Sequence, residues 1–88
     1  KDEIVLGNLA RLSKQKGQSD LIWVAKKLKQ EGLNFTILIG GEGELLSELQ
    51  KKVKEEKLEQ EVRFLGFIND VSSFYKSIDV FLFPSIWA

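Results

Sequence analysis

The sequence contains no cysteine and no histidine among its 88 residues. Disulfide bonds and thiolate metal sites are therefore excluded within these residues, as are the most common general base and metal ligand. Thirteen Lys and Arg residues balance thirteen Asp and Glu residues, so no overall positive field attracts nucleic acid or an anionic membrane. We expect no nucleic-acid partner, and any anion site must be local.

Long apolar runs are also missing. The longest, residues 80–84, is far shorter than the stretch of about 18 residues that a membrane span requires, and no signal-peptide pattern opens the chain. We expect a soluble, cytoplasmic protein whose membrane association, if any, depends on other parts. Because methionine is absent and the first residues run directly into an apolar stretch, we also expect an excerpt of a longer protein.

The composition that remains is that of an ordinary folded domain. Hydrophobic residues make up 43% of the chain and charged residues 30%, which favours neither disorder nor a fibrous repeat. A chain of this length can form one small domain. It buries only about 60–65% of its unfolded surface, so we expect its stability to be marginal.

Two kinds of apolar periodicity alternate along the chain. Short runs rich in β-branched and aromatic residues predict strands, and apolar residues at helical spacing predict helices. Residues 35–39 are hydrophobic almost throughout, which is typical of a strand buried on both faces of a parallel sheet. Gly32 has the position of a helix C-cap, and Asp70 has that of an N-cap. The predicted strands are residues 4–7, 35–39, 62–65 and 80–83, and the predicted helices are residues 20–31, 45–55 and 71–78.

The order of these elements is β-α-β-α-β-α-β. Strands that alternate with helices favour an α/β fold with right-handed crossovers rather than a sandwich or a helical bundle. We therefore predict a Rossmann-like, three-layer α/β/α domain with a parallel sheet.

Residues suited to ligand binding follow each predicted strand. In a parallel sheet every loop that leaves the C-terminal end of a strand emerges on one edge, where ligands bind. We therefore expect four loops to share one rim. They carry Arg11 and Lys16, Gly40 to Gly43, Gly66 to Asp70, and Pro84 with Ser85.

Arg11 and Lys16 lie in the loop between the first strand and the first helix. A guanidinium can bind phosphate oxygens bidentately and an ammonium adds a second charge, so the pair suits a diphosphate near the N-terminus of the next helix. Alternatively, two of thirteen cations lie in a loop because loops are solvated. The spacing alone does not decide between these interpretations.

The glycines at positions 40, 41 and 43 have two interpretations as well. Glycine lets a backbone approach a ligand closely or adopt a positive φ, and the next helix offers free N–H groups. The segment is not a dinucleotide fingerprint, because Leu46 stands where a third glycine is needed, and it is not a P-loop. It can equally be a tight turn between strand and helix.

Gly66, Phe67 and Ile68 follow the third strand. They could form an apolar wall with free backbone groups for a planar base. An aromatic residue after a strand is more often a core residue, and on the residues alone we favour that interpretation for Phe67. Trp23 is likewise expected to pack within the domain.

Taken together, these segments resemble the C-terminal, donor-binding domain of GT-B glycosyltransferases. The class is the group 1 or family-four class of retaining enzymes that use nucleotide sugars. The resemblance covers nearly the whole chain, so that residues 1–88 would be a fragment of the nucleotide-sugar-binding domain, without the N-terminal acceptor domain. It rests on four segments in the family's order: residues 11–17 with Arg-Leu-Ser and Lys-Gly, the glycine turn at 39–43, and the strands at 62–66 and 79–85.

The resemblance implies roles for eight residues. Arg11 and Lys16 would be catalytic, since they would hold the donor diphosphate and stabilise the charge that grows on it as the sugar leaves. It implies no metal and no other cofactor, because cationic side chains and helix ends neutralise the diphosphate. The residues that would bind the donor are Gly41, Gly43, Gly66, Phe67, Ile68 and Ser85.

The sequence departs from the family pattern at several positions. Ala10 and Gln15 stand where glycine and glutamate are common, and Glu44 replaces a common proline. The family also places two sugar-binding glutamates beyond the segment of Ser85, and the sequence does not contain them. We therefore expect these 88 residues not to catalyse transfer alone.

The implied partners are a nucleoside-diphosphate sugar and, through the missing N-terminal domain, an acceptor glycan or lipid-linked sugar. The implied setting is bacterial surface-polysaccharide or glycolipid synthesis. Two alternatives stay open. A non-catalytic α/β binding or interaction domain would bind no nucleotide, and a GT-B nucleotide-sugar epimerase would use the same donor pocket with other catalytic groups.

Overall fold

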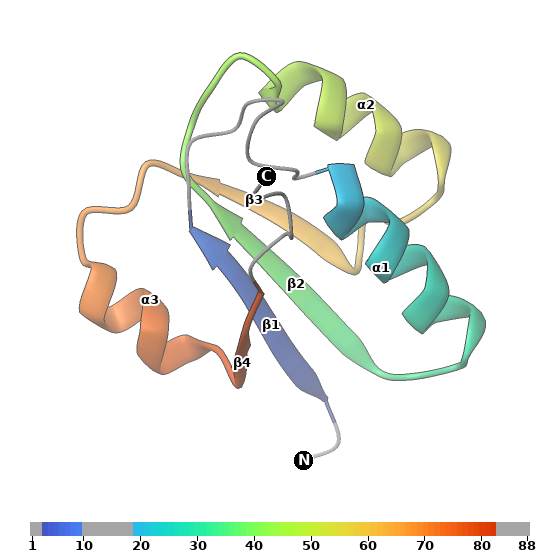
Figure 1. Cartoon of the computed structure of the whole chain (residues 1–88), viewed down its shortest axis with the longest axis horizontal. Helices are drawn as coiled ribbons and strands as arrows, with labels where there is room; N and C mark the ends of the chain where they lie inside the picture. Colours follow the sequence, from blue (N-terminus) through green and yellow to red (C-terminus); the bar gives the residue numbers. More distant parts are fainter. Residues whose placement is uncertain (1–2, 10–18, 83–88) are drawn as a thin grey trace, which may run out of the picture.

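The structure is a computed structural model that describes residues 3–9 and 19–82 (Figure 1). Strands and helices alternate within these residues as predicted, and every predicted boundary lies within two residues of the observed one. β4 ends at Phe81, earlier than predicted. The elements are β1 (Ile4–Leu9), α1 (Ser19–Gln30), β2 (Phe35–Gly40), α2 (Leu46–Glu55), β3 (Val62–Gly66), α3 (Val71–Ser77) and β4 (Val80–Phe81).

The four strands form one parallel sheet in the order β3-β2-β1-β4. The chain adds β2 and then β3 on one side of β1, and it returns to add β4 on the other side. Right-handed crossovers therefore put α1 and α2 on one face and α3 on the opposite face, and Figure 1 shows α3 apart from the other two helices. The predicted three-layer α/β/α fold is confirmed.

The core lies between the sheet and the helices α1 and α2. Phe35, Ile37 and Ile39 are buried, and as alternate residues of β2 they point to this one face. The other residues of the cluster come from β1, α1, α2, the α2–β3 connection and β3: Leu6, Leu21, Ile22, Ala25, Leu49, Val53, Leu58 and Val62.

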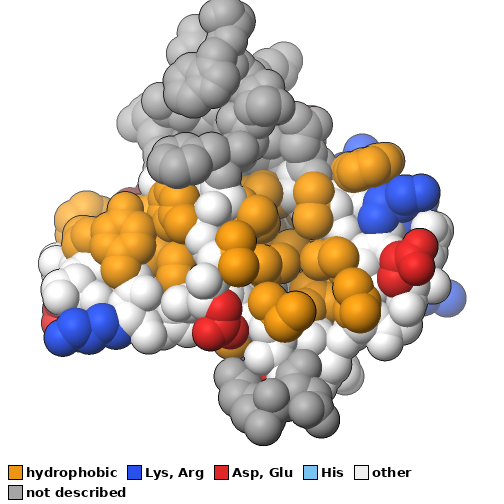
Figure 2. Space-filling view, turned by 60° about the horizontal axis from the view of Figure 1, so that its bottom comes forward, with side chains coloured by type: hydrophobic (Ala, Val, Ile, Leu, Met, Phe, Trp, Pro, Cys, Tyr) orange, Lys and Arg blue, Asp and Glu red, His pale blue; other side chains and the backbone are white. Residues whose placement is uncertain are grey.

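The opposite face of the sheet is less well covered, because α3 has only seven residues. Thr36 and Leu38 of β2 are only half-buried, so the prediction that this strand is buried on both faces is wrong for the α3 side. Large hydrophobic side chains are also exposed on β4 and α3, at Val80 and Tyr75. Figure 2, in which the bottom of the view in Figure 1 is turned toward the reader, shows hydrophobic side chains spread over this surface.

Trp23 is 61% exposed, so the prediction that it packs within the domain is wrong. The buried residues of α1 include Leu21 and Ala25, and position 23 lies between them on the outer side of the helix. The Lys27 Nζ atom lies 5.6 Å from the centroid of the Trp23 ring. None of the helices in the described part of the chain is long and apolar enough to cross a membrane.

The caps at both predicted helix boundaries are confirmed. Gly32, just after α1, has a φ of 77°, which glycine adopts without strain. Asp70 precedes α3, and its Oδ1 accepts a hydrogen bond from the Ser73 N–H at 3.0 Å while its Oδ2 accepts one from the Ser73 hydroxyl at 2.7 Å.

The cap at Asp70 predicts a pH dependence of stability. Hydrogen bonds from the side chain and the backbone N–H of Ser73 lower the pKa of Asp70. Because the pKa is lower in the folded state, the unfolded state binds protons more readily, and the contribution to stability is complete above about pH 5. It is lost as the pH falls through the folded pKa.

The variant Asp70→Asn keeps a cap acceptor but lacks the charge. We expect the unaltered protein to have the higher Tm near neutral pH, and the difference should shrink as the pH is lowered toward about 2. Thermal unfolding followed by circular dichroism across this range measures it. A Tm difference of the same size at both ends of the range would contradict the prediction.

Candidate functional site

The C-terminal ends of the four strands lie along one edge of the sheet, because all four run in parallel (Figure 1). Five of the eight predicted site residues lie at this edge. Gly41 and Gly43 follow β2, Gly66 is the last residue of β3, and Phe67 and Ile68 come directly after it.

The other three predicted site residues are Arg11, Lys16 and Ser85, which lie outside the described residues. Their roles stay predictions. The structure does define where the chain leaves the sheet before each of them, at Leu9 after β1 and at Leu82 after β4.

These two exits are neighbours at the point where the strand order reverses. β1 is paired with β2 on one side and with β4 on the other, so successive strands are added in opposite directions from β1. In open α/β sheets, ligands bind in the crevice outside the carboxyl ends of the strands at such a switch point. The topology therefore brings together the exits that lead to Arg11 and Lys16 and to Ser85.

The exits of β2 and β3 are joined to each other by a hydrogen bond. The Gly41 N–H donates to the Gly66 carbonyl at 2.7 Å. Gly41 has a φ of 118° and Gly66 has a φ of 75°, values that residues with a Cβ rarely adopt. Glycine is thus required at both positions for the backbone path that forms this part of the rim.

Ile68 links the loop after β3 to the ends of β2 and β1. A Cβ atom added at Gly40 would lie 2.7 Å from the Ile68 Cγ1 and 3.0 Å from the Leu9 Cδ1. The Ile68 side chain therefore lies across the end of β2, in space that any other residue at position 40 would fill. The side chains of Leu9, at the end of β1, and of Ile68, after β3, therefore both lie beside the end of β2.

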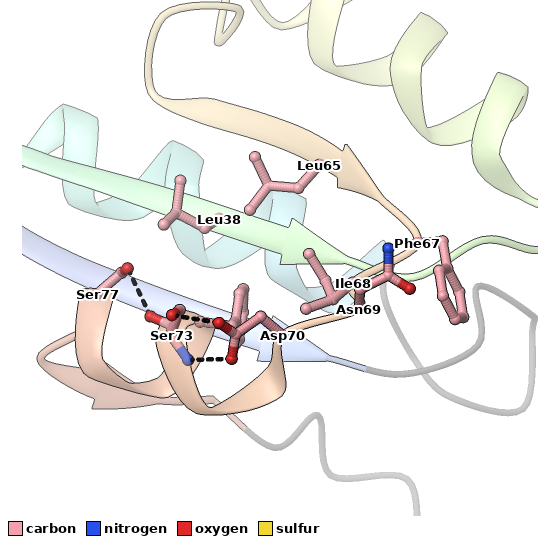
Figure 3. Close-up of a pocket in the computed structure, with 9 residues that line it drawn as sticks. Leu38, Leu65, Phe67, Ile68, Asn69, Asp70, Ser73 and Ser77 are labelled. Carbon is pink, nitrogen blue, oxygen red and sulfur yellow. Dashed lines mark hydrogen bonds between the residues drawn. The ribbon is translucent and has the colours of Figure 1, made fainter.

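An open hollow of about 290 Å³ lies beside this rim, on the face of the sheet that α3 partly covers (Figure 3). Leu38, Leu65 and Ile68 form its apolar wall, and Asp70 and Ser73 at the start of α3 form a polar side. Figure 3 shows the Phe67 ring at the far end of the group, projecting from the loop away from Leu38.

Phe67 is 68% exposed, so the interpretation of this residue as part of the core is wrong. β3 is an edge strand of the described sheet, and Phe67 lies beyond its last residue, where no helix in the described residues covers it. An exposed ring at the rim is available to a ligand or to another part of the protein.

Asn8 is a further residue at this edge that the sequence reasoning missed. It is the penultimate residue of β1 and only 2% exposed, and its Nδ2 donates to the Leu82 carbonyl at 3.0 Å. Its Oδ1 is buried and has no hydrogen-bond partner among the described residues. A polar residue within the apolar run of residues 4–9 was the available signal.

The described residues offer backbone groups and apolar side chains at the rim, and they contain no group of three or more His, Cys, Asp or Glu side chains that could hold a metal ion. The cations suited to an anionic ligand come from the predicted positions 11 and 16. The described part of the rim offers contact area for a planar, partly apolar group near β3, and an anion site near β1 stays a prediction.

Comparison with known proteins gives a family match over the whole chain. The family model described as glycosyl transferases group 1 matches residues 1–88. The O-antigen biosynthesis glycosyltransferase WclY of Escherichia coli is 34% identical over 84 residues, which are 96% of this chain and 23% of that protein. The chain spans about a fifth of the length of the curated relatives it matches.

Two solved structures share the fold at a comparable sequence identity. The C-terminal domain of the group 1 family glycosyl transferase LpcC from Francisella tularensis has a TM-score of 0.79 and 29% identity, over 91% of this chain and 45% of that one. HepE from Anabaena, solved in complex with UDP and glucose, has a TM-score of 0.79 and 27% identity, over 91% of this chain and 22% of that one.

Proposed function

The chain belongs to the family of group 1 glycosyl transferases, and from this membership we propose that it forms part of the binding site for a nucleoside-diphosphate sugar. Within the whole protein, the sugar is transferred to an acceptor with retention of the anomeric configuration. The observation that carries the proposal is the switch point of the sheet between β1 and β4, which brings together the exits that lead to Arg11, Lys16 and Ser85.

The chemical step needs charge stabilisation at this point. As the bond between the anomeric carbon and the diphosphate breaks, the nucleoside diphosphate leaves with the electron pair. The acceptor oxygen bonds to the anomeric carbon, and the acceptor hydroxyl gives its proton to the departing diphosphate. Arg11 and Lys16 bind the diphosphate and stabilise its growing negative charge, which is an electrostatic form of catalysis. No metal is needed in this proposal, since the two cations carry out the neutralisation.

The base of the nucleotide lies at the exits of β2 and β3. Gly41 and Gly66, joined by their hydrogen bond, present backbone groups there, and Ile68 and the exposed Phe67 supply apolar contact area. Gly43 allows the turn toward α2 to approach the donor closely. HepE, which binds UDP and glucose in its solved complex, supports a uridine nucleotide as the first ligand to test.

The acceptor and the setting follow from the relatives. WclY is named for O-antigen biosynthesis, which supports a surface polysaccharide or glycolipid as the product. The acceptor is then a glycan or a lipid-linked sugar, bound by a part of the protein other than residues 1–88. The reaction takes place in the cytoplasm, where nucleotide sugars are available.

A nucleotide titration tests this function. We expect UDP, or else GDP or ADP, to shift the amide resonances of Gly41, Gly66 and Ile68, and the double variant Arg11→Ala, Lys16→Ala to bind at least about tenfold more weakly. The measurements use the longest natural chain that contains these residues. Absence of any shift with all three nucleotides would contradict the proposal and favour a non-catalytic interaction domain. Release of an epimerised sugar would favour an epimerase.

A further inference from the structure

We infer that Asn8 is a positioning residue of the donor site, which fixes the direction in which the chain leaves β4 at the switch point. The inference rests on the proposed function for the site as a whole. It adds a residue that touches neither the reacting atoms nor the ligand and acts through the segment that follows Leu82.

Asn8 is placed between the two strands that define the switch point. Its backbone pairs with Ile39 in β2, and its side chain reaches in the other direction to the chain that leaves β4. The side chain is almost fully buried, and an amide is costly to bury unless it is hydrogen-bonded. Its Nδ2 has such a bond, to the carbonyl oxygen of Leu82.

Both backbone polar groups of Leu82 are thereby held by β1. The Leu82 N–H donates to the Gly7 carbonyl at 2.7 Å, and the Leu82 carbonyl accepts from Asn8 Nδ2 at 3.0 Å. β4 has only two residues. The Asn8 side chain therefore takes the place of a backbone hydrogen bond that a longer β4 would form with β1. These two hydrogen bonds fix the orientation of the Leu82 peptide, the last described one before the predicted donor-binding residue Ser85.

Asn8 Oδ1 has no hydrogen-bond partner among the described residues, which indicates that this position is not chosen for packing. A buried acceptor without a partner lowers stability, and a leucine of similar size would fill the same space without that cost. Asparagine is better than leucine at this position only if its directed hydrogen bond contributes to the structure or to function. The bond that the described residues show is the one to the exit of β4.

Asp79 provides a matched control at the other end of β4. Its Oδ2 accepts from the Val5 N–H at 2.8 Å, and its own N–H donates to the Val5 carbonyl at 2.6 Å. Asp79 therefore also holds β4 to β1 with a side chain. It does so before β4, near the start of β1 and at the edge of the sheet opposite the rim.

The experiment compares Asn8→Leu with Asp79→Ala in the longest natural chain that contains residues 1–88. We expect Asn8→Leu to weaken the binding of UDP by about tenfold or more and to raise the KM for the donor sugar, because the Leu82 carbonyl, at the exit of β4 toward the predicted donor-binding residue Ser85, is no longer held to β1. The KM for the acceptor should not change. Asp79→Ala should lower the Tm to a similar extent and leave both the UDP affinity and the donor KM within about twofold.

A purely structural role for Asn8 gives a different pattern. It would lower the folded fraction and hence the apparent kcat, with no change in the donor KM measured well below the Tm of each variant. Asn8→Ala, which removes the hydrogen bond without adding bulk, is measured in parallel in case the leucine variant does not fold. Unchanged UDP affinity in the folded Asn8 variants, or equal weakening by Asp79→Ala, would overturn the inference while the proposed function stands.

The unaltered protein separates the two proposals. If it binds UDP and the Asn8 variants bind as well, only the role of Asn8 is wrong. If it binds none of UDP, GDP or ADP, the proposed function fails, and the role of Asn8 at a donor site fails with it.

Discussion

Replacing Arg11 by alanine should lower the kcat for sugar transfer by about 10²- to 10³-fold and leave the Tm nearly unchanged. In the proposed reaction the diphosphate gains negative charge as the sugar leaves, and the guanidinium stabilises that charge more in the transition state than in the bound donor. Loss of this interaction therefore affects the rate more than the binding of the donor. Steady-state kinetics with the donor varied at saturating acceptor measure kcat and KM separately.

The chain offers a matched control for this substitution. Arg63 is the other arginine of the sequence, and it is exposed on β3, away from the exits of β1 and β4. Arg63→Ala removes the same charge and should leave kcat within about twofold. Arg11→Lys, which keeps the charge and loses the bidentate geometry, should fall between the two. Equal rates for Arg11→Ala and Arg63→Ala would show that Arg11 has no part in the chemistry.

Replacing Gly40 by valine should destabilise the protein by about 1–3 kcal/mol and also weaken nucleotide binding. Even a single Cβ at this position would lie 2.7 Å from the Ile68 Cγ1, and valine adds two further methyl groups. The Ile68 loop must then move away from the end of β2. Because this loop is proposed to contact the base, we expect the affinity for UDP to fall together with the Tm.

Two further variants separate the loop movement from a general loss of stability. Ile68→Ala makes room for a Cβ at position 40, so Gly40→Ala and Ile68→Ala should be less destabilising together than the sum of the single effects. Gly32→Ala introduces strain of about 1–2 kcal/mol at a φ of 77°, at the far end of α1 and with nothing within 4 Å of the new Cβ. It should lower the Tm with no effect on UDP affinity. Additive effects in the first pair would contradict the proposed contact between Ile68 and the end of β2.

Local signals accounted for the elements and their ends. Hydrophobic periodicity is a property of neighbouring residues, and it located the strands and helices to within a few positions. Gly32 and Asp70 act through groups three to five positions away, and both were recognised as caps. The common rim followed from the parallel sheet, because that geometry puts every loop after a strand on one edge.

Exposure was less predictable than secondary structure. Trp23 and Phe67 were both expected to be buried because aromatic side chains usually are, and both are exposed. Burial depends on whether another element covers the position. Trp23 lies on the outer side of α1 and Phe67 lies beyond an edge strand, and no propensity scale contains either fact.

The sequence by itself determined the order of the elements, the α/β fold class and the family. These depend on residue types and on short segments in a fixed order, which can be read along the chain. The tertiary structure decided the strand order, the hydrogen bond between Gly41 and Gly66, and the buried link from Asn8 to Leu82 across 74 positions. Such contacts depend on how the whole sheet assembles, because each joins segments whose local patterns carry no information about one another.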